Sequence, residues 1–130
     1  MTNFLFVLFS TILMMSFQAS ADEESGIGYA TVKEALADLS KNPHATFRTQ
    51  ASWTIVEVSS PDENSIWSFT PEGHAAYPAV VKRTIYEKDG AINLKMQVLC
   101  RGKKSDCDFL VEQFKELNSK VKNQAQGGGA

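Results

Sequence analysis

Apolar and polar side chains alternate on both sides of Asp89-Gly90, a dipeptide typical of a two-residue hairpin turn. This turn pairs Lys88 with Ala91, Glu87 with Ile92, Ile85 with Leu94, Arg83 with Met96 and Val81 with Val98. One face then carries Val81, Ile85, Ile92, Leu94, Met96, Val98 and Cys100, and the other carries Lys82, Thr84, Tyr86, Lys88, Asn93, Lys95 and Gln97. A shift of one residue would mix the two faces, so the pattern fixes the register. We predict an antiparallel hairpin with one buried and one solvated face.

Two strands and two helices are predicted around this hairpin. Segments 53–58 and 65–70 are rich in β-branched and aromatic residues, with a polar turn at 59–64 between them. A helix is expected at about 31–41, where Thr31 and Glu34 form a capping box and Pro43 follows the helical pattern. A last helix begins at Ser105 or Asp106, because apolar residues then recur every three to four positions: Cys107, Leu110, Val111, Phe114, Leu117 and Val121.

The order of these elements predicts an α+β fold: a helix, a four-stranded antiparallel sheet and a helix, with both helices on one sheet face. We assign 29–122 to this single domain, 22–28 to a flexible leader and 123–130 to a disordered tail that ends in three glycines and an alanine.

The first 21 residues have the pattern of a secretory signal peptide. An apolar run covers 4–17 and is followed by Ala19-Ser20-Ala21, a small-residue cleavage site. The run is shorter than the roughly 20 residues that a membrane span needs. We expect cleavage after Ala21, a periplasmic location and no stable membrane anchor afterwards. An uncleaved anchor is the alternative, because no Lys or Arg precedes the apolar run.

Length and charge narrow the range of functions. The chain has 130 residues, with 13 Lys and Arg against 15 Asp and Glu, for a formal charge of −2. This length favours a single domain. The balance of charge lacks the basic excess of nucleic-acid-binding proteins, so we expect no nucleic-acid partner. No motif indicates a cofactor.

Cys100 and Cys107 are expected to form a disulfide. In an exported protein, an even number of cysteines favours disulfides over free thiols. The hairpin register places Cys100 on the buried face, and the helical pattern places Cys107 on the side that faces the sheet. A redox-active pair is the alternative, although the spacing is not Cys-x-x-Cys. A metal site is not expected, since His44 and His74 lack ligand-type spacing.

Two groups of residues are candidates for binding. Segment 67–78 concentrates aromatic residues, a histidine and two prolines, and it supplies Trp67, Phe69, His74 and Tyr77. The polar hairpin face supplies Lys82, Tyr86 and Lys95. The alternative readings are that the aromatic residues cover the core and that the lysines form an ordinary solvated face.

His74 is the one candidate for acid–base catalysis, because the pKa of histidine lies near neutrality. Ser68 or Thr70 would be its nucleophile in a small hydrolase. The chain lacks the Gly-x-Ser-x-Gly motif and any Gly-rich phosphate loop, so we assign no catalytic residue.

Several segments together resemble a group of small exported proteobacterial proteins of unassigned role. They are 28–36, 53–56, 67–74, 77–83 and the pair Cys100 and Cys107. Some members of the group are labelled DnaJ-type molecular chaperones. A J domain is helical and uses His-Pro-Asp, and Asn42-Pro43-His44 is not that motif. The resemblance implies a Gram-negative periplasmic setting and supplies no catalytic residues.

These observations favour a non-enzymatic periplasmic binding module, chaperone-like or directed at an envelope protein or polymer. A small hydrolase centred on His74 is one alternative. A structural or stress-protective envelope protein is the other.

Overall fold

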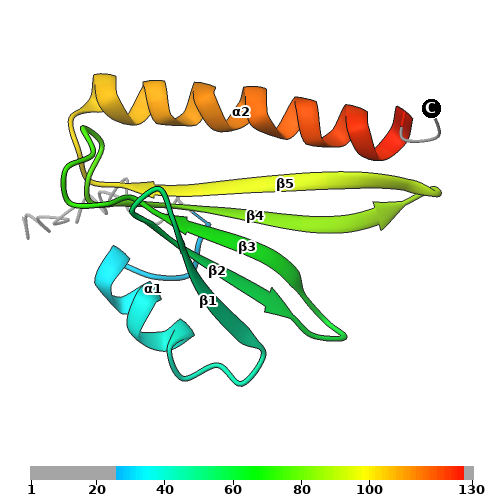
Figure 1. Cartoon of the computed structure of the whole chain (residues 1–130), viewed down its shortest axis with the longest axis horizontal. Helices are drawn as coiled ribbons and strands as arrows, with labels where there is room; N and C mark the ends of the chain where they lie inside the picture. The colour runs from blue at the N-terminus through cyan, green and yellow to red at the C-terminus, as the bar shows by residue number, and fades with distance from the viewer. Residues whose placement is uncertain (1–25, 128–130) are drawn as a thin grey trace, which may run out of the picture.

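The computed structural model describes residues 26–127, and it shows two helices and one five-stranded sheet (Figure 1). In chain order the elements are α1 (Val32–Leu39), β1 (Ala45–Gln50), β2 (Trp53–Ser59), β3 (Asn64–Phe69), β4 (Ala79–Lys88), β5 (Ala91–Cys100) and α2 (Lys104–Gly127). The strands lie side by side in sequence order, and each neighbouring pair is antiparallel. The predicted signal peptide, its cleavage site after Ala21 and residues 22–25 of the leader lie outside the described residues.

The α+β class is confirmed, but the prediction of four strands is wrong because β1 is a fifth strand. Five of its six residues are exposed and its second half is polar throughout, so β1 lacks the sustained alternation that a buried face imposes. Its turn into β2 uses Ala51 and Ser52, both with positive φ (49° and 71°). Glycine and asparagine favour such turns, and their absence removed the usual hairpin signal.

The two helices pack on opposite faces of the sheet, so the prediction that both cover one face is also wrong (Figure 1). Successive strand residues point to opposite faces, and both Val80 and Val81 are fully buried. Val80 packs in a cluster with Ala35 of α1, and Val81 packs with Leu110 of α2. The alternation near Asp89-Gly90 describes only the far end of the hairpin, whereas the start of β4 is apolar on both faces.

The predicted hairpin register is confirmed for all five pairs, from Lys88–Ala91 to Val81–Val98. The capping prediction is confirmed as well, because the Glu34 backbone N–H donates to the Thr31 hydroxyl at 3.1 Å. Helix α2 continues through 123–127, which we assigned to the tail.

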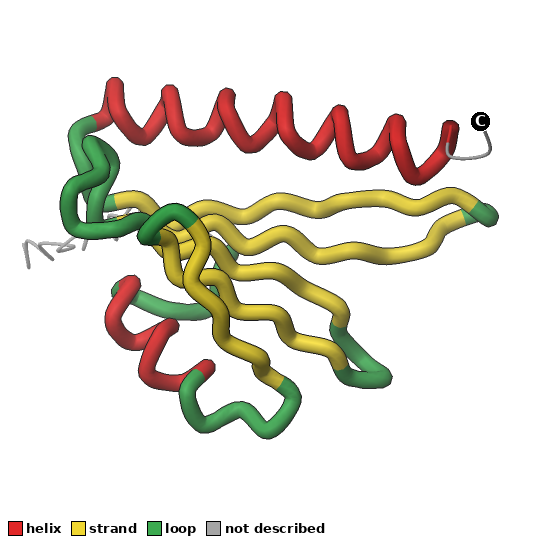
Figure 2. The backbone as a smooth tube through the Cα atoms, in the orientation of Figure 1, coloured by secondary structure: helices red, strands yellow, loops and turns green. Residues whose placement is uncertain are grey.

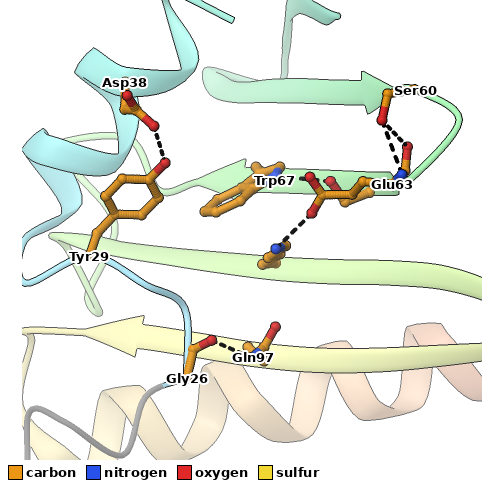
Figure 3. A network of polar contacts seen from close by, with 9 residues as sticks. Gly26, Tyr29, Asp38, Ser60, Glu63, Trp67 and Gln97 are labelled. Atoms are coloured by element: carbon orange, nitrogen blue, oxygen red, sulfur yellow. Dashed lines mark hydrogen bonds and ion pairs between the residues drawn. The ribbon is translucent and has the colours of Figure 1, made fainter.

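The end of the predicted leader belongs to the fold. Ile27 is buried in the α1-side core, and the Gln97 side-chain amide donates to the Gly26 carbonyl oxygen (Figure 3). A flexible leader is therefore the wrong description of residues 26–28, because this segment covers part of the hairpin face that was expected to be solvated.

Several connections gather at one end of the sheet (Figure 2). The turn between β1 and β2, the long connection between β3 and β4, and the segment between β5 and α2 all lie there. We call this the disulfide end, because Cys100 and Cys107 join β5 to α2 at this position.

Candidate functional site

A groove of about 830 Å³ opens at the disulfide end, on the face of the sheet that α1 covers. We call it the Tyr77 groove. Its lining is mostly apolar or hydroxyl-bearing, with three charged residues: Thr31, Val32, Lys33, Leu36, Ser52, Thr54, Phe69, Thr70, Pro71, Glu72, Tyr77, Pro78 and Arg101. The volume lies within the range of about 300–1,000 Å³ that is usual for ligand pockets.

The helical wall of the groove comes from α1. Val32 and Leu36 are one turn apart, and both stay half-buried while Ala35 and Leu39 enter the core. The apolar side of α1 is therefore wider than the part that the sheet covers, and its flank faces the groove.

The opposite wall is the connection between β3 and β4, which its own hydrogen bonds hold in place. The Thr70 hydroxyl accepts from the Ala79 backbone N–H at 3.0 Å and lies 3.2 Å from the Ala79 carbonyl oxygen. Within the connection, the Tyr77 backbone N–H donates to the His74 carbonyl oxygen at 3.0 Å. The Tyr77 side chain thus stands on an ordered turn.

The segment that follows β5 fixes this wall from the other side. The Arg101 backbone N–H donates to the Pro78 carbonyl oxygen at 2.9 Å, and the Arg101 guanidinium donates to the Ala30 carbonyl oxygen at 3.0 Å. Arg101 therefore links the β3–β4 connection to the chain just before α1. A preformed groove of this kind loses little conformational entropy when it binds a ligand.

The predicted disulfide between Cys100 and Cys107 is confirmed, with Cα atoms 5.9 Å apart. The bond joins the end of β5 to the first turn of α2 and closes a loop of six intervening residues. It anchors the segment that holds Arg101 beside the groove.

The structure separates the predicted aromatic residues into core and surface. Trp67 and Phe69 are only 3% and 4% exposed, and both belong to the α1-side core. The Trp67 ring lies edge-on to Tyr29 at 5.9 Å, and its indole N–H donates to the Ser65 hydroxyl at 3.1 Å. Tyr77 is 43% exposed and lines the groove. Of this group, Tyr77 is the side chain that a partner can reach.

The hairpin candidates lie elsewhere. Lys82 forms an ion pair with Glu63 at 2.7 Å, and its ammonium nitrogen lies 4.8 Å from the centre of the Trp67 ring. These contacts make Lys82 part of the packing around Trp67. Tyr86 and Lys95 are exposed farther along the hairpin and do not line the groove.

The contacts of His74 are those of a residue that packs within the fold. Its Nδ1 accepts from the Ala76 backbone N–H at 3.0 Å, and its ring lies edge-on to Trp53 at 5.1 Å. Among residues 26–127, no hydrogen bond joins the His74 side chain to a hydroxyl or a carboxylate. The geometry gives it neither the nucleophile nor the orienting acid that a hydrolase needs.

A hydrogen bond between a phenol and a carboxylate lies at α1, the helix that lines the Tyr77 groove. The Tyr29 hydroxyl donates to the Asp38 carboxylate, which stands on α1 opposite the ring (Figure 3). This hydrogen bond, together with burial, raises the pKa of Tyr29 to about 12. The contact joins the segment before α1 to the last turn of the helix.

Within 26–127 there is no group of three or more His, Cys, Asp or Glu side chains placed to hold a metal ion. In the same residues, no helix combines the length and apolar character that crossing a membrane requires.

Comparison with protein families, with curated proteins and with solved structures finds no match to this chain.

Proposed function

We propose that this protein is a non-enzymatic binding module of the periplasm, and that the Tyr77 groove receives an apolar side chain from an extended segment of another protein. The observation that carries the proposal is the groove itself: an apolar hollow with ordered walls and a half-exposed tyrosine at its side. Aromatic residues in such positions supply much of the binding energy of protein interfaces.

The chemistry of the lining favours a protein segment over an anionic envelope polymer. Lys33 and Arg101 are positive, but Glu72 is negative and lines the same groove. A uniformly anionic polymer would be repelled by Glu72 and would gain little from the apolar surface of Val32 and Leu36. An apolar side chain gains from that surface, and the flanking backbone of the segment can reach both signs of charge.

The periplasmic location is supported by two independent features. The disulfide fits an oxidising compartment outside the cytoplasm. The apolar run at 4–17 and the small residues at 19–21 have the pattern of a cleaved signal peptide. Capture of exposed apolar segments in this compartment would be a chaperone-like activity.

The alternative of a hydrolase centred on His74 has less support, because His74 packs on Trp53 and does not line the groove. A structural or stress-protective role without a specific ligand remains the other alternative, and it predicts that no defined surface binds peptides.

Nuclear magnetic resonance titration tests the proposal. The probe is a Gly- and Ser-based peptide with a central Phe-Leu-Phe, and the control peptide has Asp in place of these three residues. We expect the apolar peptide to shift the backbone signals of Leu36, Thr54 and Tyr77, and to leave those of Tyr86 and Lys95 in place. Shifts scattered over the surface, or the same shifts with the control peptide, would contradict the proposal.

A further inference from the structure

A second, smaller pocket of about 270 Å³ lies on the opposite face of the sheet, and residues of β1, β2, β3, β4 and α2 line it. Ile55 of β2 and Ser68 of β3 are paired across the sheet and line it. Phe114 and Leu117 of α2 line it from the helix side. The Tyr77 groove uses Thr54 and Phe69, the neighbours of Ile55 and Ser68 along the strands, so the two sites lie on opposite faces.

Two arginines reach this pocket from different strands. Arg48 stands on β1 and Arg83 on β4, and both side chains line the pocket over β2 and β3. Within 26–127, Glu57 is the one carboxylate that forms an ion pair with either arginine. It lies 3.4 Å from Arg48, and both of these side chains are about half exposed. Exposed ion pairs of this kind contribute little to stability.

Arg83 is half-buried, and no carboxylate of the described residues forms an ion pair with it. Its guanidinium carbon lies 5.2 Å from the centre of the Phe114 ring, and its Nε is buried with no hydrogen-bond acceptor among the described residues. Burial, with a smaller contribution from the charge of Arg48, lowers the pKa of Arg83. A half-buried cation without an anionic partner loses part of its hydration, and an anionic ligand would both pair with this charge and accept from the buried Nε–H.

We infer that this pocket, which we call the Arg83 pocket, binds a carboxylate whose apolar substituent packs against Trp53, Phe114 and Leu117. The planar guanidinium matches a carboxylate through two parallel hydrogen bonds. Because an apolar cavity of about 150 Å³ is large enough to hold benzene, 270 Å³ accommodates an aromatic or branched aliphatic acid.

The rest of the lining favours a carboxylate over a phosphate. Trp53, Ile55, Phe114 and Leu117 supply the apolar contacts of the pocket, and the neutral polar side chains that line it are Gln50 and Ser68. A phosphate dianion would lose more hydration than these groups could replace. The carboxylate can come from a small organic acid or from the C-terminus of a protein chain, and the two sources have the same recognition chemistry.

Benzoate is the probe for this inference, with neutral benzamide as its isosteric control and sodium chloride at matched ionic strength as the reference. The NMR signal of the Arg83 Nε–H group reports directly on the buried donor. We expect benzoate to shift this signal and to raise the melting temperature, whereas benzamide does neither.

A peptide that ends in Phe with a free carboxylate identifies the source of the bound carboxylate. Binding at least about tenfold tighter than that of benzoate indicates a protein C-terminus, and weaker binding indicates a small acid.

Two variants and one control complete the experiment. Arg83→Met nearly keeps the volume and removes the half-buried charge, so it should fold and weaken benzoate binding at least about tenfold. Arg48→Met, at the exposed edge strand, should weaken binding by a smaller factor. Lys95→Met removes an exposed positive charge outside the pocket and should leave binding unchanged. An unmoved Arg83 signal, tighter binding of inorganic phosphate than of benzoate, or equal losses in Arg83→Met and Lys95→Met would overturn the inference.

Discussion

Gly102 lies directly against the backbone of Ala76, so that a Cβ atom added to Gly102 would stand 2.8 Å from the Cα, carbonyl carbon and carbonyl oxygen of Ala76. The segment after β5 and the connection between β3 and β4 therefore touch through their main chains. Cys100 adds to the contact, with its sulfur 3.4 Å from the Ala76 carbonyl oxygen. The position of the Tyr77 groove depends on this close approach.

Gly102→Ala is expected to destabilise the protein by about 1–3 kcal/mol, the usual cost of forcing an extra methyl group into a packed site. The backbone of Ala76 cannot move away without disturbing Tyr77. Gly73→Ala is the matched control in the same connection, because an added Cβ there has no atom within 4 Å. Urea unfolding measures both variants, and equal stabilities would show that the Ala76 contact is not tight.

Removing the disulfide with the double change Cys100→Ser and Cys107→Ser is expected to cost about 2–3 kcal/mol, as the chain-entropy model gives for a short closed loop. The double variant should still bind the apolar peptide while folded, since the hydrogen bond from Arg101 to Pro78 does not involve sulfur. Urea unfolding and peptide binding are measured on the same preparation. Loss of peptide binding in a folded double variant would instead favour the redox reading of the two cysteines.

Tyr29 should make stability depend on pH in the alkaline range. Its pKa rises from 10.0 to about 12 on folding, so the neutral phenol is the favoured form in the native state. The resulting stabilisation is complete below pH 10 and is lost as the pH rises toward 12, because the unfolded state ionises first. The stability difference between the native protein and Tyr29→Phe should therefore shrink across this range. Tyr86→Phe is the control, and a constant difference for Tyr29→Phe would contradict the hydrogen bond to Asp38.

The exported protein should begin at Asp22. The pattern of 4–21 predicts cleavage after Ala21, and intact-mass measurement of the protein from the periplasmic fraction tests this directly. A mass that includes residues 1–21, with the protein in the membrane fraction, would favour the anchor instead.

The parts of the fold that sequence could predict are those in which burial differs between faces. The register around Asp89-Gly90 followed from such a difference, and so did the stripe of α2 that includes Leu110 and Phe114. Strand β1 has no buried face and its turn lacks glycine, so neither signal was present. The unbroken apolar run 79–81 indicates that the helices lie on opposite faces, because successive apolar residues of a strand point to both faces of the sheet.

The candidate site was only partly predictable. Aromatic content marked segment 67–78 correctly, but it could not separate Tyr77 from Trp67, because exposure depends on which face α1 covers. Leu36 fitted the core pattern of its helix, and its role in the groove depends on how far the sheet extends beneath α1. Arg48 and Arg83 are 35 positions apart and meet only through the strand order.

The most direct test of the proposed function compares two tyrosines of almost equal exposure. Tyr77 is 43% exposed in the groove, and Tyr86 is 44% exposed on the hairpin. Fluorescence anisotropy with the labelled Phe-Leu-Phe peptide gives the Kd of each alanine variant, with urea unfolding as the check on folding. We predict that Tyr77→Ala raises the Kd at least about tenfold and that Tyr86→Ala leaves it unchanged. Equal Kd values for the two variants would contradict the proposal that the Tyr77 groove is the binding site.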